Sequence, residues 1–191
     1  MAYKRQCGSC QACCTLLPVK SLEKPSNTRC KHQRNGKGCA IYRELETFSP
    51  ECRIWSCRWL VDPDVALYPI KRPDHAHYVI DIAPDAIRLL NEDGSERLEC
   101  VVQVWIDPDH PDAHKDPALR HYLAMIGERD GMAAIIRWGS GHSAKLLIPP
   151  ALNASGDFSF WEGTTEMTQD RLLEQAIDAG HVRLNVEIAP D

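Results

Sequence analysis

The chain lacks any long apolar run. No stretch approaches the roughly 20 residues that a transmembrane helix needs, so we expect none. It has no internal repeat and no low-complexity tract, which leaves an ordinary globular organisation. The start, Met-Ala-Tyr-Lys-Arg-Gln-Cys7, lacks the apolar core of a signal peptide. We therefore expect a cytoplasmic protein, whose thiols stay reduced.

The chain also lacks the common catalytic motifs. It has no Gly-x-Ser-x-Gly elbow and no nucleophile–base pair set by spacing. The segment Gly139-Ser-Gly141 lacks both the lysine and the third glycine of a phosphate-binding loop, so it is interpreted as a turn. These absences identify no reaction and favour a protein that is not an enzyme.

Cysteine is abundant instead, and it is concentrated near the start. Eight of the nine cysteines lie within the first 57 residues. They are Cys7, Cys10, Cys13, Cys14, Cys30, Cys39, Cys52 and Cys57. In a reducing compartment such a set favours metal binding over disulfide bonds. The predicted cofactor is zinc or iron, and all eight cysteines are the predicted ligands.

The spacing of these cysteines predicts two centres close together, or one bridged cluster. Cys-x-x-Cys lets one backbone turn present two sulfurs to one ion, and eight thiolates fill two tetrahedral sites. Cys13 and Cys14 are adjacent and diverge on a helix or a strand. Cys52 and Cys57 are out of phase on either element, so they need a local turn or separate centres. Sites filled by thiolates leave no open position, which favours structural metal.

Two other uses of the thiols remain open. The run Cys7-x-x-Cys10-x-x-Cys13 copies three ligands of bacterial ferredoxins, although the ferredoxin ending is absent. A redox iron–sulfur protein is therefore one alternative. Residues 1–60 carry a net charge of +7, which suggests a zinc-finger-like nucleic-acid binder. Two thiolate sites would reduce +7 to roughly +3, and the whole chain is at −5, so we disfavour this partner. Arg53, Arg58 and Lys31 are the expected counter-charges.

The N-terminal third resembles a known family. The matching segments are Cys7-Gly-Ser-Cys10-Gln-Ala-Cys13-Cys14, Gly38-Cys39-Ala-Ile-Tyr42 and Ser49-Pro50-Glu-Cys52-Arg-Ile-Trp-Ser-Cys57-Arg-Trp59-Leu60. Over residues 5–62 they resemble the CxxCxxCC cysteine-cluster proteins, the YkgJ-like group, described as zinc- or iron-chelating. This chain departs from the family in having Ser49-Pro50 where Arg-Pro is expected. The resemblance implies metal chelation. Because relatives include a module of flagellin lysine methylases, it also suggests an accessory role in protein modification with a protein partner.

The predicted fold class is α+β, in two parts. Residues 1–62 are expected to form a small, irregular, metal-stabilised cysteine module, with loop at 25–40 and irregular or short helical structure at 41–62. If residues 7–17 are helical, Cys7, Cys10 and Cys14 share a face; Gly8 would instead open a tight turn. Residues 63–191 are expected to form a mainly antiparallel sheet with about two helices. The predicted strands are 78–82, 86–90, 98–106, 133–138, 144–148 and 182–188, and the predicted helices are 116–127 and 168–179.

A few further residues draw attention. Cys100, in an apolar strand, is interpreted as a core residue. His75-Ala-His77 would put two imidazoles on one face of a strand, and residues 107–116 are rich in acid and imidazole. For each we favour the plainer interpretation, an exposed strand entry and a solvated loop. Trp55 and Trp59 are expected to shield the metal core.

Overall fold

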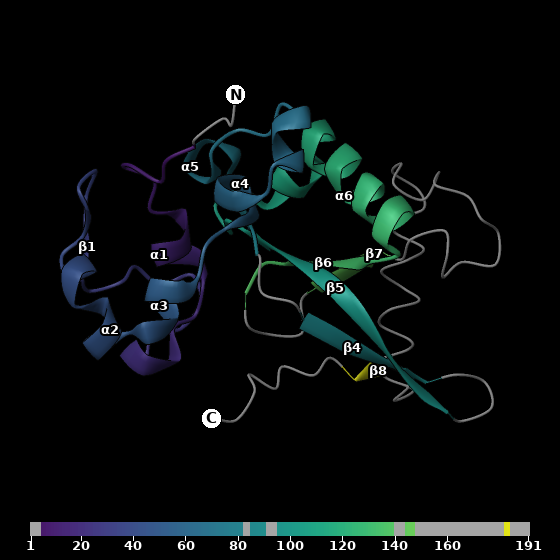
Figure 1. Cartoon of the computed structure of the whole chain (residues 1–191), viewed down its shortest axis with the longest axis horizontal. Helices are drawn as coiled ribbons and strands as arrows, with labels where there is room; N and C mark the ends of the chain where they lie inside the picture. Colours follow the sequence, from purple (N-terminus) through teal and green to yellow (C-terminus); the bar gives the residue numbers. More distant parts are fainter. Residues whose placement is uncertain (1–4, 82–84, 91–94, 140–143, 148–181, 184–191) are drawn as a thin grey trace. The chain divides into compact units, whose positions relative to one another are not determined.

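The computed structural model describes residues 5–81, 85–90, 95–139, 144–147 and 182–183. Within them the chain is a mixture of helix and sheet, which confirms the mixed class (Figure 1). Contacts divide the chain into two units, each described by itself below. Unit 1 comprises Met1–Ala83, Gln103–Tyr122 and Ile136–Ala144, and unit 2 comprises Pro84–Val102, Leu123–Ile135 and Lys145–Asp191. That residues 1–62 form a module of their own stays a prediction.

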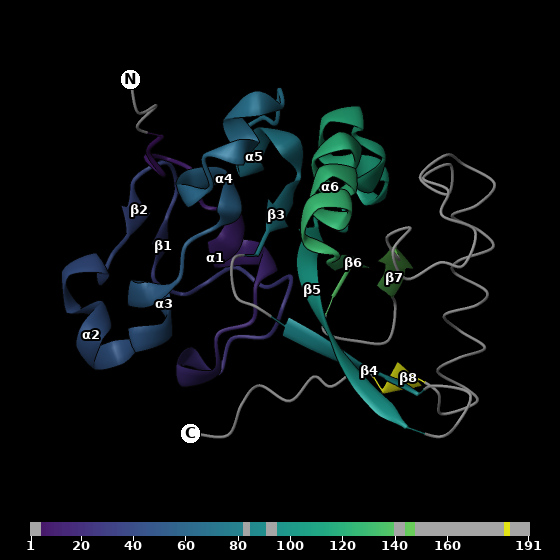
Figure 2. The ribbon, with the colours of Figure 1, turned by 45° about the vertical axis from the view of Figure 1, so that its right-hand side comes forward.

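The first part of unit 1 is built from short elements. They are α1 (Ala12–Leu16), η1 (Lys20–Leu22), β1 (Gln33–Arg34), β2 (Gly38–Cys39), η2 (Tyr42–Glu44), α2 (Leu45–Phe48), α3 (Pro50–Ile54), α4 (Arg58–Val61), η3 (Asp64–Leu67) and α5 (Pro73–Ala76). The strands β1 and β2 form a small antiparallel hairpin, seen edge to edge in Figure 2. This hairpin lies inside the segment interpreted as loop. Helices of four or five residues are too short to be stable alone, so their neighbours must hold them in place.

The core of unit 1 lies around β3 (Tyr78–Ile80). All three residues of β3 are buried, and α1, α4 and α5 contact the strand. The strand pairs antiparallel with the end of β5 (Glu96–Ile106), with Tyr78 opposite Ile106. A strand buried on both faces is uniformly apolar, as this one is. After β5 the chain forms η4 (Pro111–Lys115) and enters α6 (Pro117–Asp130).

Unit 2 contains the antiparallel ladder of β4 (Asp85–Leu90) and the first part of β5. Leu90 lies opposite Glu96, which confirms the predicted pairing of these strands; the intervening turn, residues 91–94, lies outside the described residues. The strand β8 (Val182–Arg183) pairs antiparallel with β4. Cys100 lies opposite Ala86 in the β4–β5 ladder.

The remaining elements correct several predicted boundaries. The helix predicted to end near Gly127 continues to Asp130, where Gly131 has a left-handed φ of +67° that suits a helix end. The strands β6 (Ala133–Arg137) and β7 (Ala144–Leu147) confirm two of the predicted strands. The order of strands in the sheet is β7-β6-β5-β4-β8, and β3 pairs with β5 beside this path. The predicted helix 168–179 and most of the predicted strand 182–188 lie outside the described residues. Of the helices that the structure describes, none has both the length and the apolar character to cross a bilayer.

The prediction for His75-Ala-His77 is wrong in its secondary structure. Pro73 begins the helix α5, and His77 follows it with a left-handed φ of +62°. The two imidazoles therefore do not share a strand face. Proline is well suited to the first turn of a helix, because its missing N–H has no intrahelical partner there.

A buried tyrosine provides a test of the packing in unit 1. Tyr122 is fully buried, and its hydroxyl donates a 2.7 Å hydrogen bond to Oδ2 of Asp62. Burial, and then Asp62, raise the pKa of Tyr122 well above its usual range, so the phenol stays protonated. Removing the hydroxyl with Tyr122→Phe should lower the free energy of unfolding by about 1–2 kcal/mol. Urea denaturation checks this, with the exposed Tyr42→Phe as the matched control; equal stability of the two variants would contradict it.

Candidate metal centre

The first two cysteines are placed by a tight turn. Gly8 has a left-handed φ of +53°, and the backbone N–H of Cys10 donates to the carbonyl of Cys7 at 2.9 Å. Glycine adopts this conformation without the steric penalty of a side chain. Of the two arrangements left open by the sequence, the turn is therefore confirmed. It leaves Cys7 exposed and Cys10 buried.

The adjacent pair Cys13 and Cys14 lies on α1. Successive side chains on a helix point about 100° apart, yet the two thiols lie close enough for a hydrogen bond between them. Cys13 packs, together with Cys57, against a buried apolar cluster of Leu16, Leu17, Val79 and Trp105. On the other side, the carbonyl of Cys14 accepts a 3.0 Å hydrogen bond from the backbone N–H of Cys30.

Cys39 lies on β2 of the small hairpin, and Cys30 lies three residues before β1. Gln33 lies opposite Cys39 in the ladder, and its backbone N–H donates to the carbonyl of Cys30 at 3.0 Å. Gln11, directly before α1, donates its side-chain amide to the carbonyl of Gly38 at 2.9 Å and accepts from the Gln33 side chain at 3.1 Å. These bonds attach the hairpin to the start of α1 and so bring both cysteines toward Cys14.

Cys52 and Cys57 belong to different local elements. Cys52 lies on α3, and its backbone N–H donates to the carbonyl of the fully buried Ser49 at 3.0 Å. Cys57 precedes α4 and forms an isolated antiparallel bridge with Asp81, beside β3. Ser49 thus supports Cys52. The helix α3 ends at Ile54 and α4 begins at Arg58, so the two cysteines do not share one regular element, and the choice between a local turn and separate centres stays a prediction.

The thiols act on one another's pKa, and we use these influences to group them. The pKa of Cys57 is raised to about 11, chiefly by burial and in part by Cys10 and Cys7. A hydrogen bond to Cys14, and then burial, raise the pKa of Cys13, with added contributions from the charges of Cys14, Cys7 and Cys57. Burial, and then Cys14, also raise the pKa of Cys7. We group Cys7, Cys10, Cys13 and Cys57 as a candidate set, centre I, which is linked to Cys14 through both Cys7 and Cys13.

The remaining four thiols form centre II. Burial raises the pKa of Cys39 and that of Cys52, and for both Cys14 and Cys30 raise it further. Centre II therefore consists of Cys14, Cys30, Cys39 and Cys52. The hydrogen bond from Cys13 lowers the pKa of Cys14 to about 7, which joins the two centres at the adjacent pair.

All eight thiols are free, which fits metal ligands in number and chemistry. Their spacing is wider than that of a closed site: among the described residues, no three cysteine sulfurs lie within 4.8 Å of one another. A tetrahedral zinc ion with bonds of about 2.3 Å holds its sulfurs about 3.8 Å apart. Metal capture would therefore draw the side chains of each set together.

The cations near the thiols differ from those expected. Lys24 is buried beside Cys30, Cys14, Cys13 and Cys52, and Arg72 lies near Cys10 and Cys7. Two of the expected counter-charges contact acids: Arg53 lies 3.8 Å from Glu46, and Arg58 lies 3.3 Å from Asp62. Arg72 likewise pairs with Asp74 at 2.6 Å, so its charge is shared between this acid and the thiols. No sequence motif indicates that Lys24 or Arg72 lies near the thiols, because folding brings each of them there.

The two tryptophans differ in role. Trp55 packs against the same apolar cluster as Cys13 and Cys57, and its indole N–H donates to Oδ1 of Asp81 at 2.7 Å. Trp59 instead donates to the carbonyl of Ile70 at 3.2 Å and lies under the Arg5 guanidinium. Trp55 is thus the tryptophan placed to cover the thiols.

Three polar residues that the sequence treats separately come together elsewhere in unit 1. They are His77, Asp107 and His110, whose ligand atoms all lie within 4.8 Å of one another. The two histidine-bearing segments are 30 residues apart, so spacing alone gave no signal.

Comparisons with protein-family models, curated proteins and solved structures found no match to the chain. The resemblance of residues 5–62 to the CxxCxxCC cysteine-cluster proteins therefore stays a prediction.

Proposed function

We propose that the protein binds two metal ions, zinc or iron, in two four-thiolate centres that organise its N-terminal segment. Centre I would hold one ion through Cys7, Cys10, Cys13 and Cys57, and centre II the other through Cys14, Cys30, Cys39 and Cys52. The supporting observations are that all eight thiols are free and that, around the short helix α1, several of them raise one another's pKa. Cys13 and Cys14, adjacent on α1 and joined by a hydrogen bond, would each bind a different ion.

The chemistry of each set suits a structural role. Four thiolates complete a tetrahedral site and leave no position for substrate. A bound ion would supply a cross-link between segments that share few apolar contacts. Lys24 and Arg72 would offset part of the negative charge that four thiolates leave on each centre.

Elemental analysis of anaerobically purified protein tests the function. We expect about two zinc or iron ions per chain. Colourless protein with two zinc ions would support structural zinc. Brown protein with acid-labile sulfide would support the iron–sulfur alternative at the same ligands. Protein that carries less than one ion per chain would contradict metal binding.

Serine variants test the pairing. Cys7→Ser and Cys57→Ser should each remove one ion, and the two together should still remove only one, because both belong to centre I. Combining Cys7→Ser with Cys39→Ser should remove both ions, since the substitutions affect different centres. Cys100→Ser, outside the thiol-rich segment, is the matched control and should keep two ions. Loss of two ions from the Cys7→Ser/Cys57→Ser protein, but one from Cys7→Ser/Cys39→Ser, would contradict the pairing.

A further inference from the structure

We propose a separate site for a divalent transition metal, Zn²⁺ or Fe²⁺, formed by His77, Asp107 and His110. It shares no ligand with the thiolate centres and does not depend on them.

The sheet brings the three residues together. His77 directly precedes β3, and Asp107 directly follows β5. Because Tyr78 lies opposite Ile106 in the antiparallel ladder, the flanking residues His77 and Asp107 also meet, and the backbone N–H of Asp107 donates to the carbonyl of His77 at 2.9 Å. A turn then returns His110 to the same place, with its N–H bonded to the carbonyl of Asp107 at 2.9 Å. The backbone thus fixes all three positions.

The ligand atoms converge on one carboxylate oxygen. Oδ2 of Asp107 lies 3.3 Å from Nδ1 of His110 and 3.7 Å from Nδ1 of His77. A tetrahedral ion with bonds of about 2.0–2.1 Å holds its nitrogen and oxygen ligands about 3.3 Å apart. All three ligand atoms lie within 4.8 Å of one another, a closer grouping than that of any three cysteine sulfurs among the residues that the structure describes.

The two imidazole rings lie against each other. They stack with centroids 3.5 Å apart and an interplanar angle of 16°. An imidazole binds a metal along the lone pair in the plane of its ring, so one ring would turn to share an ion with the other. The His110 side chain is 50% exposed, which gives its ring room to turn.

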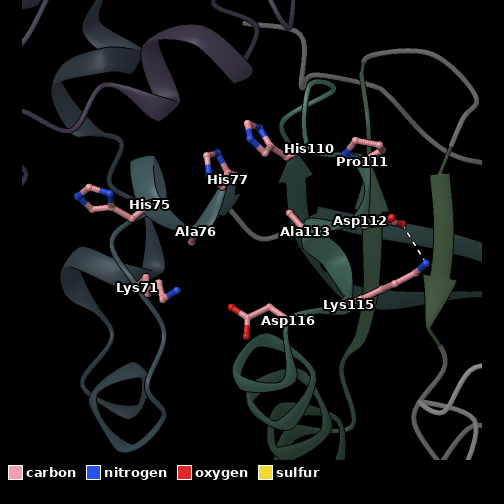
Figure 3. A pocket seen from close by; sticks show the side chains of 10 residues that line it. All are labelled: Lys71, His75, Ala76, His77, His110, Pro111, Asp112, Ala113, Lys115 and Asp116. Carbon is pink, nitrogen blue, oxygen red and sulfur yellow. Dashed lines mark ion pairs between the residues drawn. The ribbon is translucent and has the colours of Figure 1, made fainter.

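The position opens onto a cavity. His77 and His110 line a pocket of about 560 Å³, and Figure 3 shows their rings side by side at its edge while His75 points away from them. Three protein ligands with open positions are the arrangement of catalytic zinc and of two-histidine, one-carboxylate iron sites. Water or a small ligand in the pocket would complete the coordination. Lys71 and Lys115 also line it, and Lys115 pairs with Asp112 at 2.9 Å.

Calorimetric titration of Zn²⁺ into the purified full-length chain, after its resident metal has been measured, tests this site. We expect one further equivalent to bind. His110→Ala should weaken that binding by about 100-fold or more, because losing a ligand costs at least as much as losing an outer-shell partner. His110 is exposed, so the variant should keep its fold, which circular dichroism checks. Asp107→Asn should have a similar effect. His75→Ala is the matched control and should bind as the parent does.

Three results would overturn the proposal: no further equivalent in the parent chain, unchanged binding in His110→Ala, or equal loss in His75→Ala. Failure of the thiolate proposal would be seen separately, as purified protein without resident metal. A histidine-ring NMR shift on adding Zn²⁺, seen in the parent and absent in His110→Ala, gives a second readout.

Discussion

If the thiols hold metal as proposed, removing it with a strong chelator should expose the thiol-bearing segment to solvent while β3 and its partner strand β5 stay folded. A structural zinc site contributes about 10 kcal/mol or more near neutral pH. The helices that carry or flank these cysteines have three to five residues, and Tyr42, Phe48 and Ile54 are 63%, 52% and 83% exposed. So little apolar burial cannot hold short helices against chain entropy.

Hydrogen exchange measured by mass spectrometry checks this result. Peptides covering residues 7–57 should lose protection when metal is removed. Peptides covering β3 and residues 101–106 should keep it, because Val79, Ile80 and Val104 are fully buried in a hydrogen-bonded ladder. Zinc added back is the control and should restore protection. Unchanged exchange in residues 7–57 would argue against structural metal.

Replacing Lys24 with methionine should cost about 3 kcal/mol of folding free energy. Lys24 is 7% exposed, and its ammonium donates to the carbonyls of Thr15 and Pro25 at 3.1 Å and also to that of Leu17. Methionine preserves most of the volume but donates no hydrogen bond, so buried carbonyls lose their charged donor. Burial lowers the pKa of Lys24, and the nearby thiols raise it.

Urea denaturation of metal-free and metal-loaded protein measures the Lys24→Met effect. The exposed Lys37→Met is the matched control and should stay within about 0.5 kcal/mol of the parent. If ammonium charge also stabilises bound thiolates, the Lys24→Met penalty should be larger in the loaded protein. Equal stability of the two lysine variants would show that the buried hydrogen bonds contribute nothing net.

The sequence predicted best those helices and strands whose own residues carry a recognisable pattern. Alternating or continuous apolar residues located β3, β4, β5 and β6, and Asp116-Pro117 together with Leu119, Leu123 and Ile126 located α6. The short helices between residues 41 and 62 have no comparable period, because four residues cannot display one. Their boundaries depend on tertiary packing.

The candidate sites, like the fold, have a part that the sequence indicates and a part that depends on tertiary contacts. Cysteine spacing predicts that the eight thiols act together, which stays a prediction, while the glycine of the first Cys-x-x-Cys indicated the turn that is observed. Which thiols associate depends on the hairpin that Gln11 attaches to α1, a contact that no spacing rule gives. The meeting of His77 with Asp107 requires the register of β3 against β5. Each histidine-bearing segment, taken alone, is interpreted as solvent-exposed and without a ligand.

The placement of Cys13 and Cys14 side by side on α1 bears on how the two ions would be acquired. The first ion to arrive would immobilise this helix and thereby orient one ligand of the empty neighbouring site. The second ion then meets a smaller entropic penalty, which is positive cooperativity without any direct contact between the ions. We therefore expect chains to be either vacant or doubly occupied at sub-stoichiometric zinc, with few singly loaded species in native mass spectra.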